Sequence, residues 1–184
     1  MRFRVCALVL LGLLAACASS PRINYYTLGT VSSGTVAPAV NLVVERFQTS
    51  EALGRAQLMI ATRATELEYY AADQWAGGLG ELVQLKLAAE FGPKVDGRRT
   101  LIVSGRVLAC EQVETKPLNQ ARLELFVVVR DAELKRYQGS LFEKLYEARR
   151  PVASGTPSVV VEELSRCAEQ IAAQIAADAA VHVE

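Results

Sequence analysis

The segment 121–130 alternates apolar and polar side chains at every second residue. This period is typical of a β-strand, with Leu123, Leu125, Val127 and Val129 on one face and Arg122, Glu124 and Arg130 on the other. An apolar sheet face has to be covered by other elements of the same chain. The segment therefore predicts a layered fold in which something packs on one side of a sheet.

Other β-rich segments lie on both sides of this strand along the chain. We expect further strands over 23–28, 40–47, 57–62, 66–70, 98–113 and 137–148. In the segment 98–113, simple alternation places Leu101, Val103, Val107 and Ala109 on one face, and Ser104, Arg106, Leu108 and Cys110 on the other.

Two segments show helical spacing. In the first, Asp73 is a candidate N-cap, and Gly92-Pro93 is a stop signal. Its apolar stripe is Trp75, Leu79, Leu82, Val83, Leu87 and Phe91, with Trp75 expected as a core anchor where helix and sheet meet. Gly77, Gly78 and Gly80 weaken its first turns but permit a close approach to a sheet.

The second helix is expected over 158–180, after Thr156 as N-cap. Its buried stripe would be Val161, Leu164, Ala168, Ile171 and Ile175. Strands and helices in this order predict a single α+β domain, with a largely antiparallel sheet and two long helices packed on one face.

The N-terminus has the features of a secretory signal. Arg2 and Arg4 precede the apolar run 5–14, and small residues follow before Cys17. A spanning helix needs roughly 20 apolar residues, and the polar residues at 19–22 come too early for that. We therefore expect residues 1–16 to be a signal peptide that is removed.

Leu14-Ala15-Ala16-Cys17 resembles the bacterial lipobox, in which the cysteine thiol is acylated before the signal is cut. This makes Cys17 the predicted lipidation site, and several acyl chains on one residue anchor a protein stably. Residues 17–22 would be a short tether, because five residues reach at most about 17 Å, and 23–184 would be the folded domain. The alternative is an ordinary signal peptide with no role for Cys17.

The charge balance excludes some partners. The chain has 20 basic and 20 acidic residues; loss of residues 1–16 removes Arg2 and Arg4 only, which leaves a net charge near −2. A nucleic-acid-binding domain needs a clustered basic surface, and so no nucleic acid partner is expected. The membrane contact must come from the acyl chains.

Cys110 and Cys167 remain as an even pair in an oxidising compartment. A disulfide between them would close a loop of about 57 residues, worth roughly 3–4 kcal/mol on the chain-entropy model. Cys167 lies at the edge of the helical stripe, so it could face the sheet that carries Cys110. Two buried free thiols are the alternative.

The sequence shows no recognisable arrangement of catalytic residues. The one histidine, His182, is the third residue from the C-terminus, where a general base is poorly held. No His, Cys, Asp and Glu residues have the spacing of metal ligands. The pairs Glu66/Glu68 and Glu162/Glu163 are more simply explained as solvent-exposed side chains than as an acid/base couple. We expect no enzyme activity, no cofactor beyond the covalent lipid and no metal; no separate apolar surplus indicates a lipid pocket.

Four features occur in an order that resembles a known family. These are Cys17, Tyr25-Tyr26-Thr27-Leu28, then Ala56-Gln57-Leu58 leading into 59–63, and Leu67-Glu68-Tyr69-Tyr70 before Asp73-Gln74-Trp75-Ala76. The chain resembles the ABC-type transport auxiliary lipoproteins, the PqiC-like family, over most of 17–180. Arg63-Ala64-Thr65 departs from the Gly or Asn turn usual there.

The resemblance implies a role in lipid transport across the bacterial envelope. Such lipoproteins work beside an MCE-domain protein, with or without an ABC transporter permease, and dock the conduit at the outer membrane as a homo-oligomer. Ala18 is not the Asp that retains lipoproteins in the inner membrane of enteric-type bacteria. By that rule the domain sits on the periplasmic face of the outer membrane.

Two tyrosine pairs are interface candidates, because tyrosine is enriched at interfaces and neighbours in a strand face opposite ways. They are Tyr25 with Tyr26 and Tyr69 with Tyr70. Two other functions stay open: a regulatory lipoprotein that acts on a cell-wall synthase or another envelope complex, and a lipid-anchored hydrolase. The short tether disfavours the first, and the lack of a usable histidine disfavours the second.

Overall fold

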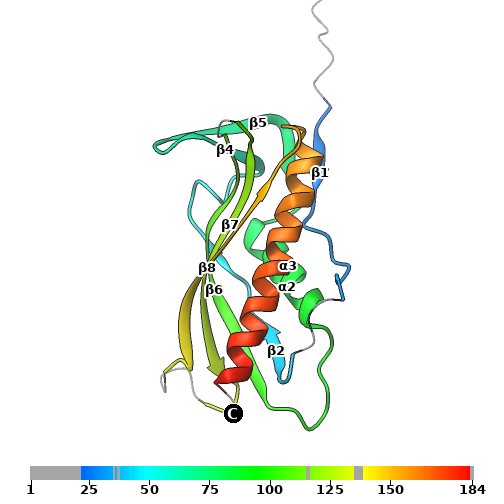
Figure 1. Ribbon diagram of the computed structural model, residues 1–184, viewed down its shortest axis with the longest axis vertical. Helices are drawn as coiled ribbons and strands as arrows, with labels where there is room; N and C mark the ends of the chain where they lie inside the picture. The colour runs from blue at the N-terminus through cyan, green and yellow to red at the C-terminus, as the bar shows by residue number, and fades with distance from the viewer. Residues whose placement is uncertain (1–21, 35, 37, 115–116, 135–138, 183–184) are drawn as a thin grey trace, which may run out of the picture.

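A mixed sheet with two helices on one face forms the domain (Figure 1). The computed structural model describes residues 22–34, 36, 38–114, 117–134 and 139–182; Cys17, the predicted lipidation site, lies outside them. The elements are β1 (Asn24–Tyr26), β2 (Asn41–Val44), β3 (Gln48–Thr49), β4 (Gln57–Arg63), β5 (Glu66–Trp75), α2 (Leu79–Phe91), β6 (Thr100–Val113), β7 (Gln120–Asp131), β8 (Phe142–Pro151) and α3 (Pro157–Val181).

Strand β6 holds the sheet together because both of its edges are paired. Along one edge it pairs with β7, antiparallel, from Leu101 to Val113. Along the other edge it pairs with β2, β3 and β4 in succession, all parallel. The sheet continues from β7 to β8 and from β4 to β5, both antiparallel, and then to β1, parallel. Most paired residues are antiparallel, which confirms the predicted fold class.

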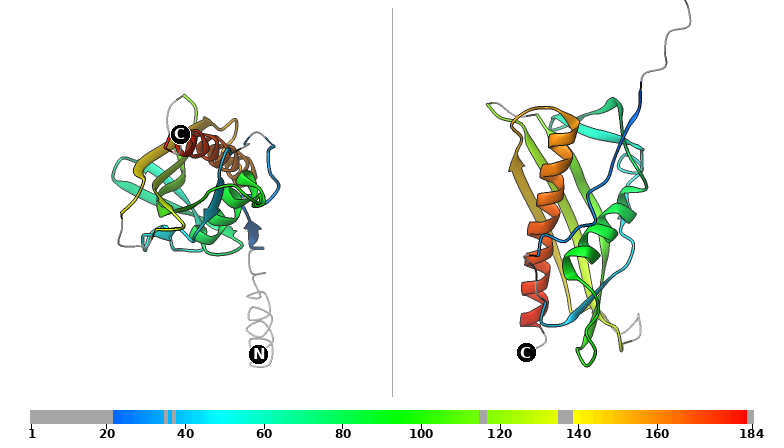
Figure 2. Two further views of the ribbon diagram at one scale, coloured as in Figure 1. Left: turned by 90° about the horizontal axis from the view of Figure 1, so that it is seen from below. Right: turned by 90° about the vertical axis from the view of Figure 1, so that its right-hand side faces the viewer.

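The helices cover one face of this sheet, and the views of Figure 2 show α3 lying along it. Every second residue of β7 is fully buried under them: Ala121, Leu123, Leu125, Val127 and Val129. Helix α3 contributes the predicted stripe Val161, Leu164, Ala168, Ile171 and Ile175, all buried. The alternation read from 121–130 is therefore confirmed as the core face of β7.

Alternation fails in β6, where the register with β7 shifts between Val107 and Ala109. This β-bulge adds one residue and turns the following side chains to the other face. Cys110 pairs with Leu123 and is buried on the helix side, whereas Ala109 pairs with Glu124. The expected grouping of Ala109 with Leu101, and of Cys110 with Arg106, is therefore wrong beyond Leu108.

The first helix begins later than expected. Asp73 is not an N-cap but lies in β5, where it pairs with Asn24 and accepts hydrogen bonds from Asn24 Nδ2 and Tyr26 Oη, both at 3.0 Å. Trp75 ends β5 and is 5% exposed, in the core. The pairing with β1, distant in sequence, keeps this stretch extended, and α2 starts after Gly78.

The segment after β1 crosses the two helices and is held there by buried polar contacts (Figure 2). Lys86 Nζ lies 2.8 Å from Glu90 Oε1 and 2.8 Å from Glu169 Oε1, which joins α2 to α3. Ser33 donates to Glu90 from its hydroxyl, at 2.6 Å, and from its backbone N–H. Burial raises the pKa of Glu90, but the bonds from Lys86 and Ser33 outweigh it and leave the pKa below its usual value.

Cys110 and Cys167 occupy neighbouring sites in the core between β6 and α3. Both are free thiols in the structure and are almost fully buried. The Cys167 thiol lies 3.8 Å from the Ala121 carbonyl oxygen, on the strand that pairs with Cys110. Burial raises the pKa of both thiols, that of Cys167 to about 12. The folded protein therefore presents no reactive thiolate here, and a disulfide would have to form during folding.

Gly80 allows α2 to approach the sheet closely. A Cβ at this position would overlap the carbonyl oxygen of Phe47, and the Phe47 N–H donates to the Gly80 carbonyl at 3.4 Å.

Overpacking a close contact such as that of Gly80 costs about 1–3 kcal/mol. We therefore expect Gly80→Ala to lower the free energy of unfolding measured in urea, although alanine favours a helix. Gly77→Ala is the control, because its Cβ would meet only Leu82 Cδ2 at 3.9 Å; equal midpoints for both variants would contradict the close approach.

The disulfide between Cys110 and Cys167 stays a prediction. On oxidation by a disulfide reagent or thiol oxidase, the two thiols lose two electrons and two protons. We expect the exported protein, unfolded without reductant, to resist alkylation at both positions and to yield one cross-linked peptide by mass spectrometry. Two alkylated cysteines would rule the bond out, and Cys167→Ala serves as the control that leaves Cys110 open to alkylation.

Candidate functional site: a groove on the open face of the sheet

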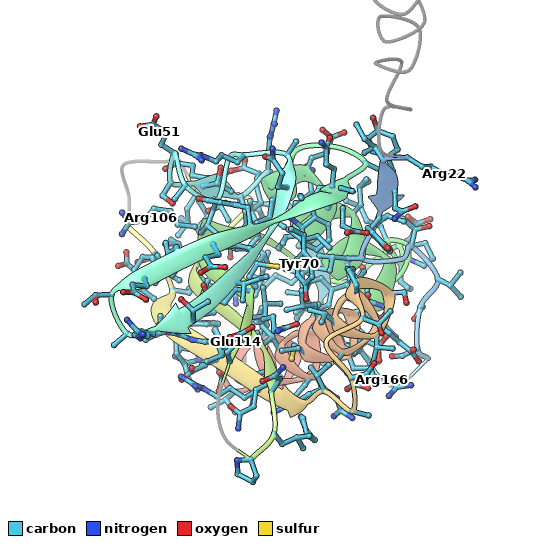
Figure 3. All side chains as sticks on the ribbon, turned by 90° about the horizontal axis from the view of Figure 1, so that it is seen from above. Arg22, Glu51, Tyr70, Arg106, Glu114 and Arg166 are labelled. Carbon is cyan, nitrogen blue, oxygen red and sulfur yellow. The ribbon has the colours of Figure 1, made fainter. Side chains whose placement is uncertain are left out.

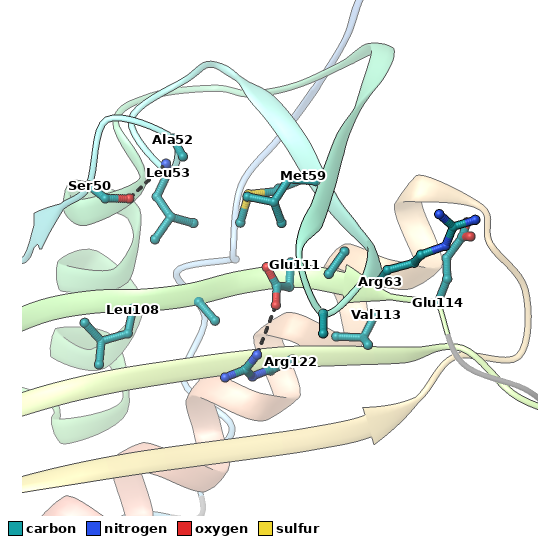
Figure 4. A pocket seen from close by; sticks show the side chains of 14 residues that line it. Ser50, Ala52, Leu53, Met59, Arg63, Leu108, Glu111, Val113, Glu114 and Arg122 are labelled. Atoms are coloured by element: carbon teal, nitrogen blue, oxygen red, sulfur yellow. Dashed lines mark hydrogen bonds and ion pairs between the residues drawn. The ribbon is translucent and has the colours of Figure 1, made fainter.

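The face of the sheet opposite the helices is partly roofed by the β4–β5 hairpin and the turn at 50–56 (Figure 4). Beneath this roof lies a cavity of about 400 Å³. Its lining is mainly apolar, and we call it the hairpin hollow: Leu53, Met59, Ala61, Leu67, Leu108, Ala109 and Val113. Leu67 and Leu108 are 50% and 44% exposed, so the hollow opens to solvent.

Three of the four charged side chains that line the hairpin hollow, Arg63, Glu111 and Arg122, form ion pairs, and the fourth is Glu114. Glu111, 5% exposed, accepts a hydrogen bond from Arg122 Nη1 at 3.3 Å (Figure 4). Arg122 also contacts Glu124 and Glu147. Burial raises the pKa of Glu111 more than Arg122 lowers it. At the hairpin tip, Arg63 pairs with Glu66 at 2.8 Å.

A second hollow of about 480 Å³ lies further down the same face and is rich in arginine. We call it the arginine hollow: Arg46, Arg106 and Arg130, with Glu45, Gln48, Ser104, Gly105, Phe126 and Val128. Arg130 pairs with Glu45 at 2.9 Å. The guanidinium carbon of Arg106 lies 5.6 Å from the centre of the Phe126 ring. Within the part of the chain that the structure describes, neither Arg46 nor Arg106 has a carboxylate partner.

A third, smaller hollow joins the other two. It is lined by Gln48, Thr49, Ser50, Arg106, Val107 and Leu108. It shares Gln48 and Arg106 with the arginine hollow, and Ser50 and Leu108 with the hairpin hollow. The three form one groove along β6, basic at one end and apolar at the other.

The tyrosines expected at interfaces lie outside this groove. Tyr25 is 64% exposed. Tyr26 is half-buried, and its hydroxyl donates to Asp73. Tyr69 donates to the Ala52 carbonyl at 3.3 Å, and the Tyr70 hydroxyl lies within hydrogen-bond distance of both the Gln112 side-chain oxygen and the Gly155 carbonyl oxygen. Tyr25 is thus the member of the first pair that faces solvent, whereas both members of the second pair bond internally.

Sequence reasoning missed the groove itself. The alternation of the sequence correctly places Arg106 and Leu108 on one face of β6, but no sequence pattern links them to the segments 45–53 and 59–67. Among the described residues, no group of three or more His, Cys, Asp or Glu side chains could hold a metal ion. His182 stacks on Phe142 with ring centres 4.6 Å apart, and neither residue lines the groove. The groove offers shape, charge and apolar surface, which are properties of a binding site.

No described helix is both long and apolar enough to cross a bilayer. The fold is similar to that of a Xanthomonas campestris protein of the DUF330 family, with 15% identity and a TM-score of 0.69 over 86% of this chain and 96% of that one. It is also similar to an uncharacterized protein, with 14% identity and a TM-score of 0.65 over 86% and 99%. These likenesses concern the fold alone.

Comparison with curated proteins finds no match. A family model, the ABC-type transport auxiliary lipoprotein component, matches residues 26–176. That range extends from the end of β1 into the second half of α3 and so includes the groove. The chain therefore belongs to the family of ABC-type transport auxiliary lipoprotein components.

Proposed function

We propose that this protein is a non-catalytic docking component of an intermembrane lipid transport system of the MCE type. The observation that carries the proposal is the family match over 26–176, in a chain whose residues 14–17 resemble a lipobox. In this role, acyl chains on Cys17 hold the domain on the periplasmic face of the outer membrane. Its partners are an MCE-domain protein and, in systems that have one, an ABC transporter permease.

The position of β1, which lies close to the start of the described chain, supports docking close to the membrane. Strand β1 and the β4–β5 hairpin lie at the same end of the domain, opposite the C-terminus (Figure 1). The five residues 18–22 reach at most about 17 Å from an acylated Cys17. The hairpin end would therefore face the membrane, and the far end would face the conduit.

Envelope pull-downs test the partner assignment. We expect the full-length protein with a C-terminal tag, cross-linked in cells, to recover an MCE-domain protein and to fractionate with the outer membrane. Cys17→Ser should move it to the inner membrane or the soluble fraction, because the anchor is lost. Recovery of cell-wall synthases without any MCE protein would instead favour a regulatory lipoprotein and overturn the proposal.

Tyr25 is the side chain we propose for contacts between copies of the chain. Its ring is exposed, and it lies in β1, which is at the hairpin end of the domain (Figure 1). We expect Tyr25→Ala to shift the detergent-extracted mature lipoprotein toward smaller species in cross-linking and native mass spectrometry. Tyr26→Phe is the control, since it keeps the ring and removes only the bond to Asp73. An unchanged size distribution for Tyr25→Ala would remove Tyr25 from the interface.

A further inference from the structure

We infer that the groove along β6 binds one phospholipid, with its phosphate against Arg46 and Arg106 and an acyl chain extending past Leu108 into the hairpin hollow. This deepens the proposed function by naming a ligand, and it rests on that function only for the source of the lipid.

The basic end suits a phosphate. Arg46 and Arg106 are exposed, and no carboxylate of the described residues neutralises either one. A guanidinium presents a planar fork of N–H donors that matches phosphate oxygens. The Phe126 ring under Arg106 restricts this guanidinium before a ligand arrives, which lowers the entropy lost on binding.

The other end repels an anion but accepts an acyl chain. Its two arginines already pair with carboxylates, Arg122 with Glu111 and Arg63 with Glu66, and Glu114 adds one more negative charge. A negatively charged head group is therefore favoured only at the Arg46 and Arg106 end. Leu67 and Leu108 are exposed, and Leu53 and Met59 lie buried beside them. An acyl chain that covers this surface would remove apolar area from water, which favours binding.

The length of the apolar part agrees with an acyl chain. From Leu108 to Val113, β6 rises about 16 Å at roughly 3.3 Å per residue. Half of a bilayer's hydrocarbon core, the depth that one chain fills, is about 15 Å. A ligand with its phosphate beside Arg106 would therefore place its chain end under the hairpin.

The orientation also agrees with the anchor. The β4–β5 hairpin, which roofs the hairpin hollow, lies at the same end of the domain as β1 (Figure 1). The arginine hollow lies further from that end along β6, because Arg106 pairs with Gln48 of β3, whereas the hairpin strand β4 pairs with β6 from Glu111 to Val113. A lipid drawn head-first from the membrane toward the domain would enter in this direction, with its tail trailing on the membrane side.

The test uses the chain from residue 17 onward with Cys17→Ser, which contains every strand and helix that the structure describes. Titration calorimetry with oleoyl lysophosphatidate, below its micelle concentration, should show saturable one-to-one binding. We expect oleoyl lysophosphatidylcholine to bind at least several-fold more weakly, because its head group has no net charge. Inorganic phosphate at the same concentration should neither bind measurably nor compete.

Matched variants identify the site. Arg46→Gln with Arg106→Gln should weaken lysophosphatidate binding at least tenfold, because two charge-assisted contacts are lost. Arg98→Gln with Arg166→Gln removes the same charge elsewhere, and Arg166 lies on the opposite side of the domain from Arg106 (Figure 3). Leu108→Gln should weaken binding several-fold, whereas Leu85→Gln, at 45% exposure against 44%, should not.

Three results would overturn the inference. They are no binding of lysophosphatidate, equal losses in the test and control variants, and binding of inorganic phosphate as tight as that of the lipid. Competition by an acidic peptide of a recovered partner, with no lipid binding, would instead assign the groove to a protein. Lipid binding that fails in Arg46→Gln with Arg106→Gln, together with no MCE protein in the pull-downs, would uphold the groove and reject the proposed function.

Discussion

The double-sided pairing of β6 is the interaction on which the rest of the structure depends. One edge carries β7 and, through it, β8, while the other edge carries β2, β3 and β4 in turn. The bulge at Leu108 then decides what each face presents. Without it, Glu111 would point toward the helices and Cys110 toward the groove. A single added residue in one strand therefore decides which side chains beyond Leu108 face the core and which face the groove.

The helix side supplies rigidity, and the open side supplies the site. Buried contacts of Lys86, Glu90 and Glu169 tie the helices to each other, and Ser33 ties the N-terminal segment to them. Breaking a buried ion pair leaves an uncompensated charge, which costs about 3–5 kcal/mol. The segment that leads to the tether is thus fixed on the domain, so a short anchor would also orient the groove relative to the membrane.

Local periodicity correctly predicted the elements whose apolar stripe is the face buried in the fold. The alternation of 121–130 and the stripe of 158–180 both recur as buried faces, because the periods of 2 and 3.6 follow from backbone geometry. The same reasoning failed at Asp73 and Trp75. Their spacing to Leu79 fits a helix, but pairing with Asn24 and Tyr26 holds them extended. Strand β3, two residues long, has no periodicity to detect.

The sequence alone was enough to assign the fold class, the resemblance to the family and the predicted anchor at Cys17, because each depends on local patterns of side chains or on the order of such patterns along the chain. Only the tertiary structure decided which side of β6 each residue faces and whether a site exists. The groove is assembled from 45–53, 59–67, 104–114 and 122–130. Strand pairing and one register shift bring these segments together, and neither leaves a signal in the local pattern of side chains.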